Sequence, residues 1–264
     1  MDLELTDKVV LVAASSKGLG LGIARQAALE GAIVAMGSRK QEHLHAAKES
    51  ILNDAPGARI FTHILDVGEA ASIEAWVKNS LAELGPAHAL VVNGGGPPPG
   101  KFDEIDDAAW QKGYENTLMS AVRLIRAVLP EMRRAGSGAI LTVTSSSVKE
   151  PIDNLILSNV YRSGVTSLVK SLSIQEAPHG IRINNLVPGF FDTDRLRELN
   201  RRISEEQELE LDAVRKNHFD HIPLGRYGQP DEFGKAAVFL LSEAASYVTG
   251  ETFIIDGGKM RTVW

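Results

Sequence analysis

A glycine-rich segment near the N-terminus carries the first chemical signal of the sequence. Residues 14–22 read Ala-Ser-Ser-Lys-Gly-Leu-Gly-Leu-Gly, between an apolar run and a helical pattern. Glycines let a backbone approach a ligand closely, and a helix start offers free N–H groups and the positive end of the helix dipole. The segment therefore predicts a pyrophosphate site. It departs from the G-x-G-x-x-G spacing, and a turn needed only for strand–helix packing would use the same residues.

Two cations stand where they would select between dinucleotides. The second apolar run ends in Gly37-Ser38-Arg39-Lys40, with no Asp or Glu where a carboxylate would hold a ribose 2′-hydroxyl. Arg39 can pair with a 2′-phosphate through its planar guanidinium, and Lys17 adds a positive charge from the glycine loop. This pattern favours NADP(H) over NAD(H). The alternative is that Arg39 and Lys40 only begin an exposed helix.

Apolar runs alternate with helical patterns and would bring these segments to one edge of a sheet. The runs are continuous, as expected of strands buried on both faces. Strands are predicted at residues 9–14, 32–37, 59–65, 88–93, 139–144, 181–187 and 252–256, and helices at 19–30, 41–52, 70–84, 108–134 and 160–176. The helical pattern at 108–134 is expected to end at Pro130 at the latest. We predict one doubly wound α/β domain over residues 1–264, with three layers (α/β/α) and a parallel sheet of about seven strands.

Composition excludes several classes of protein. The 264 residues hold 28 basic and 34 acidic side chains, a net charge of −6, which argues against a nucleic-acid partner. Without cysteine, disulfides, thiolate metal sites and cysteine nucleophiles are impossible. No apolar run approaches the roughly 20 residues that a membrane span needs, and acids stand where a signal peptide would be basic. We expect a cytoplasmic protein with no membrane partner and no bound metal.

One segment departs from the alternation of strands and helices. Residues 194–216 are dense in Arg and Glu, with apolar side chains interspersed. They predict either a solvated helix pair or a mobile lid over a substrate pocket, because they follow a Pro-Gly loop at the end of a strand. The helical lid would span residues 194–222.

From Lys8 to Gly258 the sequence resembles the short-chain dehydrogenase/reductase family, and most of all its β-ketoacyl carrier-protein reductase-like members. The glycine loop is similar to the family's Thr-Gly-x-x-x-Gly-x-Gly, with Gly18 and Gly20 kept. The other matching segments are Asp66-Val67, Val92-Asn93-Gly94-Gly95, Asn116, Thr144-Ser145-Ser146, Asn185 to Gly189 with Thr193, Pro223 to Arg226, Thr249-Gly250-Glu251 and Asp256-Gly257-Gly258. Ala13-Ala14 replace Thr-Gly, and because Ala14 has a β-carbon, we expect its backbone to avoid positive φ.

The resemblance implies a Rossmann-like fold and a nicotinamide cofactor. Asp66 would contact adenine, and the Pro188-Gly189 loop with Thr193 would hold the nicotinamide carboxamide. The full set of implied cofactor contacts is Ser15, Ser16, Lys17, Gly18, Leu19, Gly20, Ser38, Arg39, Asp66, Val67, Asn93, Gly94, Gly95, Arg162, Pro188, Gly189 and Thr193. The family's oligomers further imply a homotetramer formed through the helical patterns at 108–134 and 160–176.

The family's catalytic Tyr-x-x-x-Lys is replaced in this chain. Counting thirteen residues on from Ser145, which matches the catalytic serine, reaches Ser158, and the position four further on is Arg162. Ser158 thus stands for the tyrosine and Arg162 for the lysine. Tyr161 does not restore the motif, because Val165 follows it at the lysine spacing. Asn116 matches the family's structural and proton-relay asparagine.

Chemistry leaves three mechanisms open. In the first, Ser145 and Ser158 bind the substrate oxygen, Arg162 supplies positive charge, and a water held by Asn116 delivers the proton. In the second, Tyr161 acts as the acid. In the third, the site binds NADPH without turnover, as a scaffold or cofactor-responsive module. An arginine keeps its proton, so Arg162 can orient groups but cannot shuttle protons as a lysine might. The first two predict an NADP(H)-dependent reductase or alcohol dehydrogenase for a small-molecule substrate, with 3-oxoacyl compounds among the candidates.

Overall fold

The computed structural model describes residues 2–263 and contains one seven-stranded sheet. The strands are β1 (Val9–Val12), β2 (Ile33–Ser38), β3 (Ile60–Ile64), β4 (Ala89–Val92), β5 (Gly138–Val143), β6 (Ile181–Pro188) and β7 (Thr252–Ile255). They lie in the order β3-β2-β1-β4-β5-β6-β7, and every neighbouring pair is parallel. The order reverses between β1 and β4, which leaves a crevice at their carboxyl ends where such sheets bind ligands.

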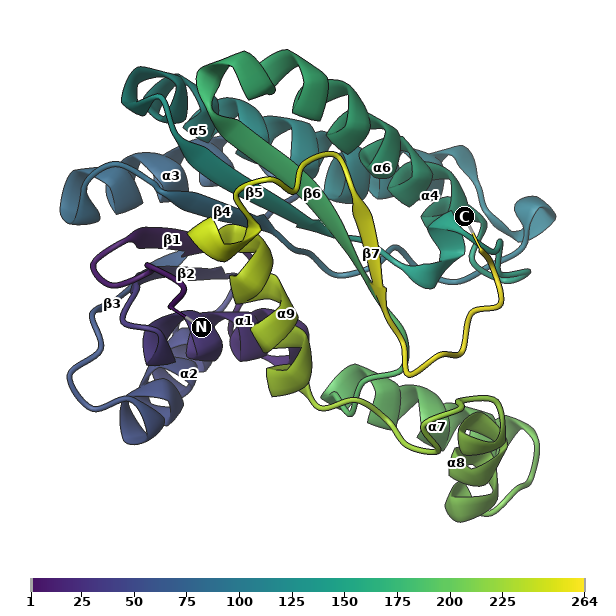
Figure 1. Cartoon of the computed structure of the whole chain (residues 1–264). Coiled ribbons are helices and arrows are strands. Elements are labelled where there is room, and N and C mark those ends of the chain that lie inside the picture. The colour runs from purple at the N-terminus through teal and green to yellow at the C-terminus, as the bar shows by residue number, and fades with distance from the viewer. Residues whose placement is uncertain (1, 264) are drawn as a thin grey trace.

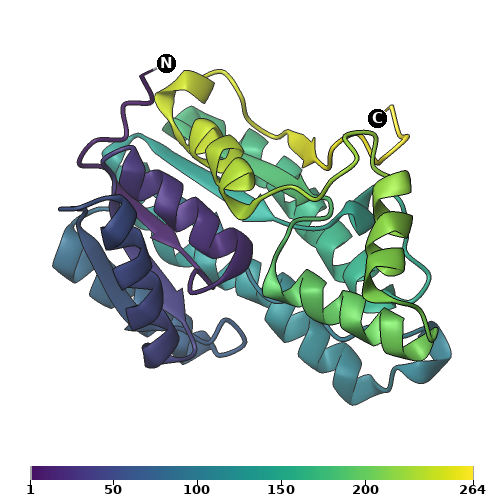
Figure 2. The same ribbon diagram turned by 90° about the horizontal axis from the view of Figure 1, so that it is seen from below.

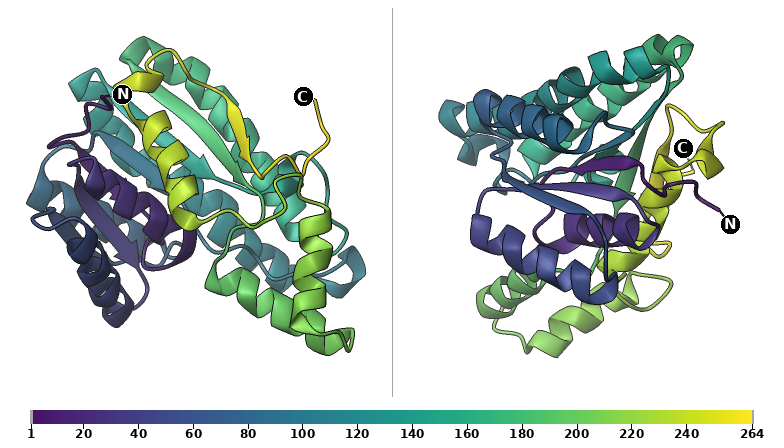
Figure 3. Two further views of the ribbon diagram at one scale, coloured as in Figure 1. Left: turned by 60° about the horizontal axis from the view of Figure 1, so that its bottom comes forward. Right: turned by 90° about the vertical axis from the view of Figure 1, so that its left-hand side faces the viewer.

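Helices cover both faces of the sheet (Figure 1). The helices of the main body are α1 (Gly18–Leu29), α2 (Gln41–Asp54), α3 (Ala70–Leu84), α4 (Asp107–Gly113), α5 (Ser120–Ala135), α6 (Ile156–Glu176) and α9 (Pro230–Leu241). Ile23, Leu44 and Phe233 from α1, α2 and α9 belong to the core under one face. Trp76, Leu124 and Val165 from α3, α5 and α6 belong to the core over the other. The three-layer arrangement, visible edge-on in Figure 3, confirms the predicted doubly wound α/β fold.

The segment predicted as one helix over 108–134 is divided differently. The chain forms α4, then a π-helical turn at Tyr114–Met119, then α5, and Pro130 lies inside α5 instead of ending it. The expected stop at Pro130 was therefore wrong. Leu129 and Met132 are buried on either side of the proline, and burying such side chains offsets the roughly 3 kcal/mol that an interior proline costs.

Helix α9 was not predicted, and it closes the face of the sheet beside α1. A Cβ on Gly22 would lie 2.3 Å from the carbonyl oxygen of Pro230, and one on Gly234 would lie 2.4 Å from the carbonyl oxygen of Gly22. The two helices can approach this closely only because both positions lack a side chain. Their packing fixes α1, and with it the loop that precedes α1.

Helices α7 (Asp194–Glu206) and α8 (Leu211–Asp220) form the segment that departs from the alternating pattern. They follow the carboxyl end of β6 and project from the body of the domain (Figures 1 and 2). A small separate core of Leu196, Ile222 and Tyr227 holds them. Within residues 2–263, no helix has the length and apolar character needed to cross a membrane.

Candidate active site

The glycine loop leaves β1 through an unusual backbone conformation. Ala14 has φ +48°, so the expectation that it avoids positive φ was wrong. The Asn93 side chain, from the end of β4, donates to the carbonyl oxygens of Ala13 at 3.3 Å and Ala14 at 3.1 Å. These bonds hold a conformation that costs a residue with a β-carbon roughly 1–2 kcal/mol. A Cβ on Gly20 would lie 2.4 Å from the Ala14 oxygen, so Gly20 is required for this close turn.

The glycine loop is tied to the end of β2. The hydroxyls of Ser16 and Ser38 lie 2.8 Å apart. Arg39 follows Ser38 as an exposed side chain and makes no hydrogen bond or ion pair within residues 2–263. Lys17 precedes α1 in an extended conformation. Cations therefore stand at the ends of β1 and β2, and no carboxylate occupies the end of β2.

The ends of β3 and β4 complete this side of the site. A carboxylate oxygen of Asp66 accepts a hydrogen bond from the backbone N–H of Gly68 at 3.0 Å, which shapes the loop after β3. A methyl group of Val67 would lie 3.8 Å from a Cβ on Gly94. The buried Ser15 hydroxyl has no hydrogen-bond partner within residues 2–263.

A cavity of about 500 Å³ opens along the carboxyl ends of the strands. It brings together most of the predicted site. The predicted residues that line it are Lys17, Gly18, Leu19, Gly20, Asn93, Gly94, Gly95, Ser145, Ser158, Arg162, Pro188, Gly189 and Thr193. The predicted residues outside its lining are Ser15, Ser16, Ser38, Arg39, Asp66, Val67, Asn116 and Tyr161.

Ser158 lies in the first turn of α6 and is only 6% exposed. Its hydroxyl lies 3.2 Å from the hydroxyl of Ser147, which is buried in a 3₁₀ turn after β5. Ser145 begins that turn, and its hydroxyl accepts from the Ser147 N–H at 3.2 Å. Sequence reasoning did not select Ser147. The run of three serines at 145–147 was the only sequence feature that pointed to it, and the conformation of the 3₁₀ turn decides which of the three contacts Ser158.

Arg162 is buried one turn further along α6. Its Nη1 donates to the carbonyl oxygens of Val143 at 2.9 Å and Thr144 at 2.8 Å, at the end of β5. Burial lowers the pKa of the guanidinium to about 10, and the positive charge of Arg195 contributes. The other guanidinium nitrogens make no hydrogen bond within residues 2–263, so they remain available to a ligand.

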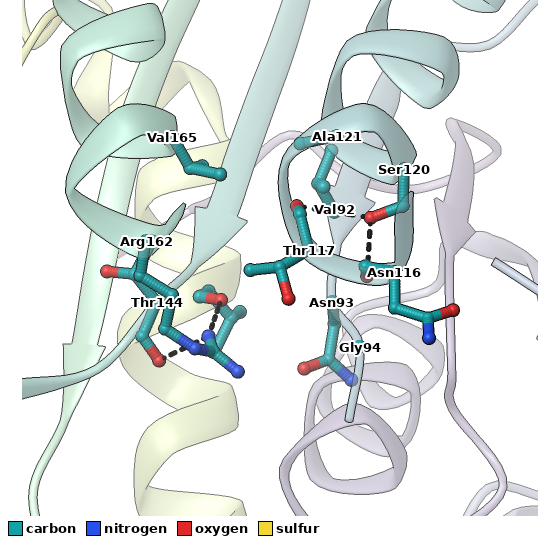
Figure 4. Close-up of a pocket in the computed structure, with 11 residues that line it drawn as sticks. Val92, Asn93, Gly94, Asn116, Thr117, Ser120, Ala121, Thr144, Arg162 and Val165 are labelled. Atoms are coloured by element: carbon teal, nitrogen blue, oxygen red, sulfur yellow. Dashed lines mark hydrogen bonds between the residues drawn. The ribbon is translucent and has the colours of Figure 1, made fainter. Parts of the chain in front are cut away.

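A second, smaller cavity of about 20 Å³ lies behind Arg162 (Figure 4). Arg162 and Thr144 stand on one side, and Asn116, Thr117 and Ser120 on the other. The Thr117 hydroxyl is buried without a partner in the described chain. The π-helical turn carries Asn116, whose carbonyl oxygen accepts from the Ser120 hydroxyl at 2.8 Å. The volume is enough for one water molecule, and the walls offer it several polar partners.

Tyr161 points away from both cavities. Its hydroxyl donates to the carbonyl oxygen of Trp110 at 3.0 Å, and its ring meets the Trp110 ring edge-on at 5.6 Å. Burial raises the pKa of the phenol, and the nearby Tyr114 adds to the shift. The structure therefore places Tyr161 in the packing between α4 and α6, apart from Ser158.

Helix α7 contributes residues that sequence reasoning did not select. Asp194, Arg195, Leu196 and Leu199 of α7 line the larger cavity. Arg195 could not be chosen from sequence, because α7 contains four arginines and only the fold shows which one faces inward.

The two histidines of α8 and its C-terminal end each contact neighbouring protein groups. His218 stacks on Phe190 at 4.5 Å, and its Nδ1 lies 2.8 Å from the Tyr227 hydroxyl. His221 Nδ1 bonds the Asn217 carbonyl oxygen at 2.7 Å. Within residues 2–263, no group of three metal-ligating side chains was found.

Known proteins resemble this chain over nearly its whole length. Residues 13–259 match the family described as enoyl-(acyl carrier protein) reductase. Dehydrogenase/reductase SDR family member 4 of Sus scrofa is 33% identical over 256 residues, covering 96% of this chain and 88% of that protein. L-sorbose reductase of Gluconobacter frateurii, solved with NADPH and L-sorbose, has a TM-score of 0.95 at 30% identity and full coverage of both chains.

A third solved structure also matches nearly the whole chain. A short chain oxidoreductase of Pseudomonas aeruginosa PAO1, described as containing an atypical catalytic center, has a TM-score of 0.89 at 31% identity. The match covers 98% of this chain and 99% of that one. Together with the cavity and its motif residues, these similarities confirm the resemblance found in the sequence. The chain belongs to the short-chain dehydrogenase/reductase family of oxidoreductases.

Proposed function

We propose that the protein is an NADP(H)-dependent reductase of small carbonyl compounds, or a dehydrogenase of the matching alcohols, that works with Ser158 and Arg162. The observation that carries the proposal is the cavity. It gathers Ser145, Ser158 and a buried guanidinium beside the glycine loop. Buried charge without a carboxylate partner is expensive to keep, so such groups are typical of sites that act on a ligand.

The residues present fit a dinucleotide phosphate. Gly18 and Gly20 line the cavity, and helix α1 begins there, so its free N–H groups would face a pyrophosphate. Arg39 and Lys17 would hold a 2′-phosphate, and Asp66 with Val67 would border adenine. When bound, the nicotinamide supplies or accepts the hydride. NADPH in the L-sorbose reductase structure supports the same preference here.

The chain's own groups supply the rest of the chemistry. The Ser145 and Ser158 hydroxyls would donate hydrogen bonds to the substrate oxygen, and Ser147 would orient Ser158. The free nitrogens of Arg162 would stabilise negative charge as it forms on that oxygen. Because a serine hydroxyl is a far weaker acid than a phenol, the proton must come from elsewhere.

We propose that a water in the smaller cavity relays the proton: it delivers a proton to the substrate oxygen and receives one from solvent in its place. The Thr117 hydroxyl and Arg162 would position it, because both line that cavity, whereas the Asn116 side-chain amide is turned toward Gly68. Losing a well-placed general acid typically costs about 10²–10⁴-fold. We therefore expect turnover that is slower than in relatives with a catalytic tyrosine.

Calorimetry and an absorbance assay test this proposal. We expect NADPH to bind at least tenfold more tightly than NADH, and NADPH to be oxidised with at least one member of a panel of ketones, diketones, quinones and acyl thioesters. Ser158→Ala should lower kcat/KM, whereas Ser163→Ala, on the exposed side of the same helix, should not. Failure of both cofactors to bind would refute the proposal.

A second function is supported by the cavity lining, in which no tyrosine of residues 2–263 supplies a phenol. Tight NADPH binding with no turnover in either direction would favour a cofactor-binding scaffold.

We also propose the homotetramer that the family resemblance implies. The apolar side chains of Val160 and Ile174 on α6 are 46% and 70% exposed, and such an assembly would cover them. Light scattering measures the mass of the particle in solution and so tests the tetramer.

A further inference from the structure

Helix α7 contains four arginines, and one of them differs from the other three in its contacts. Arg197 pairs with Asp192 at 2.9 Å and with Asp194 at 3.4 Å. Arg201 pairs with Glu198, and Arg202 with Glu206. Arg195 makes no ion pair and no hydrogen bond within residues 2–263. Helix α7 is rich in acidic side chains that could form an ion pair with Arg195, so the lack of such a pair calls for another explanation.

Arg195 faces the active-site cavity instead. Its side chain lies against Gly96, in the loop after β4: a Cβ on Gly96 would stand 2.9 Å from both Nη1 and Nη2. Gly96 and Arg195 both line the cavity that holds Ser158 and Arg162. The guanidinium therefore lies in the cavity between α7 and the loop after β4, while Arg39 lies outside the cavity lining, at the end of β2.

The charge balance of the cavity is strongly one-sided. Its lining contains the cations Lys17, Arg162 and Arg195 and a single acid, Asp194, which is engaged by Arg197. Arg162 and Arg195 line the same cavity, and the positive charge of Arg195 contributes, after burial, to lowering the pKa of Arg162. Two neighbouring cations without a counter-ion are unfavourable in the free protein, and an anion bound between them removes the repulsion.

We propose that the substrate carries an oxyanion, a carboxylate or a phosphate, and that Arg195 binds it while Arg162 faces the carbonyl. Arg195 is then a specificity-determining residue supplied by the lid. A guanidinium can hold either oxyanion through two parallel hydrogen bonds, and its contact would also draw α7 over the cavity. This inference rests on the reductase function proposed above, because it assigns the substrate to the same cavity.

Binding of unreactive probes tests the inference without requiring the true substrate. Butanoate, butyl phosphate and the neutral butanamide would be titrated calorimetrically into the protein saturated with NADP⁺. We expect at least one of the two anions to bind tenfold or more tightly than butanamide. In Arg195→Met that preference should fall to less than threefold. Arg202→Met is the matched control, since it removes a cation from the same helix outside the cavity lining, and it should retain the preference.

The outcomes separate the two proposals. If NADP⁺ and NADPH do not bind, the reductase function fails. If they bind and butanamide equals both anions in the unmodified protein, the oxyanion inference alone is refuted. It is also refuted if Arg195→Met weakens NADPH more than tenfold while the anion preference stays, because Arg195 would then hold the cofactor. Preference for butanoate or for butyl phosphate identifies the oxyanion.

Discussion

Arg162→Met separates the structural and chemical roles of the buried guanidinium. Two opposing contributions to stability can be worked from the structure. Burial lowers the pKa of the guanidinium well below its usual range, to about 10, so keeping the buried charge costs about 3 kcal/mol. Methionine removes that cost and fills much of the space. It also leaves the carbonyl oxygens of Val143 and Thr144 without their donor, at about 1–3 kcal/mol each.

The two contributions nearly cancel. We expect Arg162→Met to lower the free energy of unfolding by about 0–3 kcal/mol, which for a chain of this size is a fall in Tm of at most about 10 °C. Activity should suffer far more, because the substrate oxyanion loses its cation: kcat/KM should fall by about 10²-fold or more. NADPH affinity should fall as well.

Thermal unfolding followed by circular dichroism and steady-state kinetics at neutral pH measure both quantities. A fall in Tm well beyond 20 °C would show that the main role of the Arg162 guanidinium is to stabilise the end of β5. A kcat/KM within threefold of the unmodified protein would remove Arg162 from the chemistry. Either result would refute the reasoning above.

Three further changes have defined outcomes. Tyr161→Phe should leave kcat/KM within twofold and lower Tm by only a few degrees, since only the bond to the Trp110 carbonyl is lost; a tenfold loss in kcat/KM would return the phenol to the mechanism. Arg39→Ala should reduce the ratio of NADPH to NADH affinity at least tenfold by calorimetry, and an unchanged ratio would contradict the 2′-phosphate assignment. Glu176, whose pKa is lowered by its hydrogen bond with Arg133, stabilises the fold above the unfolded-state pKa of about 4.3 and loses this effect as pH falls through the folded pKa. Glu176→Gln should therefore lower Tm at pH 7, with the difference shrinking in acid, and equal Tm differences at both pH values would contradict it.

The sheet was predictable because its strands are buried on both faces. Continuous apolar runs such as 9–14 and 139–144 predicted β1 and β5 to within two residues at each end. The stop at Pro130 was wrong because tertiary burial outweighs local helix propensity. Helix α9 was missed although Pro230 and the Gln229–Glu232 capping box mark its start.

The site was predictable in its motifs but not in the directions of its side chains. Spacing from Ser145 indicated Ser158 and Arg162, and the cavity contains all three. Spacing alone could not show that Tyr161 turns toward Trp110 or that Arg195 turns inward, because both depend on how α6 and α7 pack. The positive φ of Ala14 depends on a distant side chain, Asn93, which no local pattern reveals.

The makeup of the cavity lining has a consequence for the response of the enzyme to acid and alkali. Within residues 2–263, no histidine, cysteine or tyrosine lines the cavity, and these are the side chains that most often exchange protons near neutral pH. A reductase built this way has no ionisation to shape its rate in that range. We expect a plateau in kcat/KM from about pH 6 to pH 9, because the burial that lowers the pKa of Arg162 to about 10 still leaves its guanidinium charged in that range. An enzyme with such a profile would keep its rate through changes in pH that slow relatives dependent on a phenol.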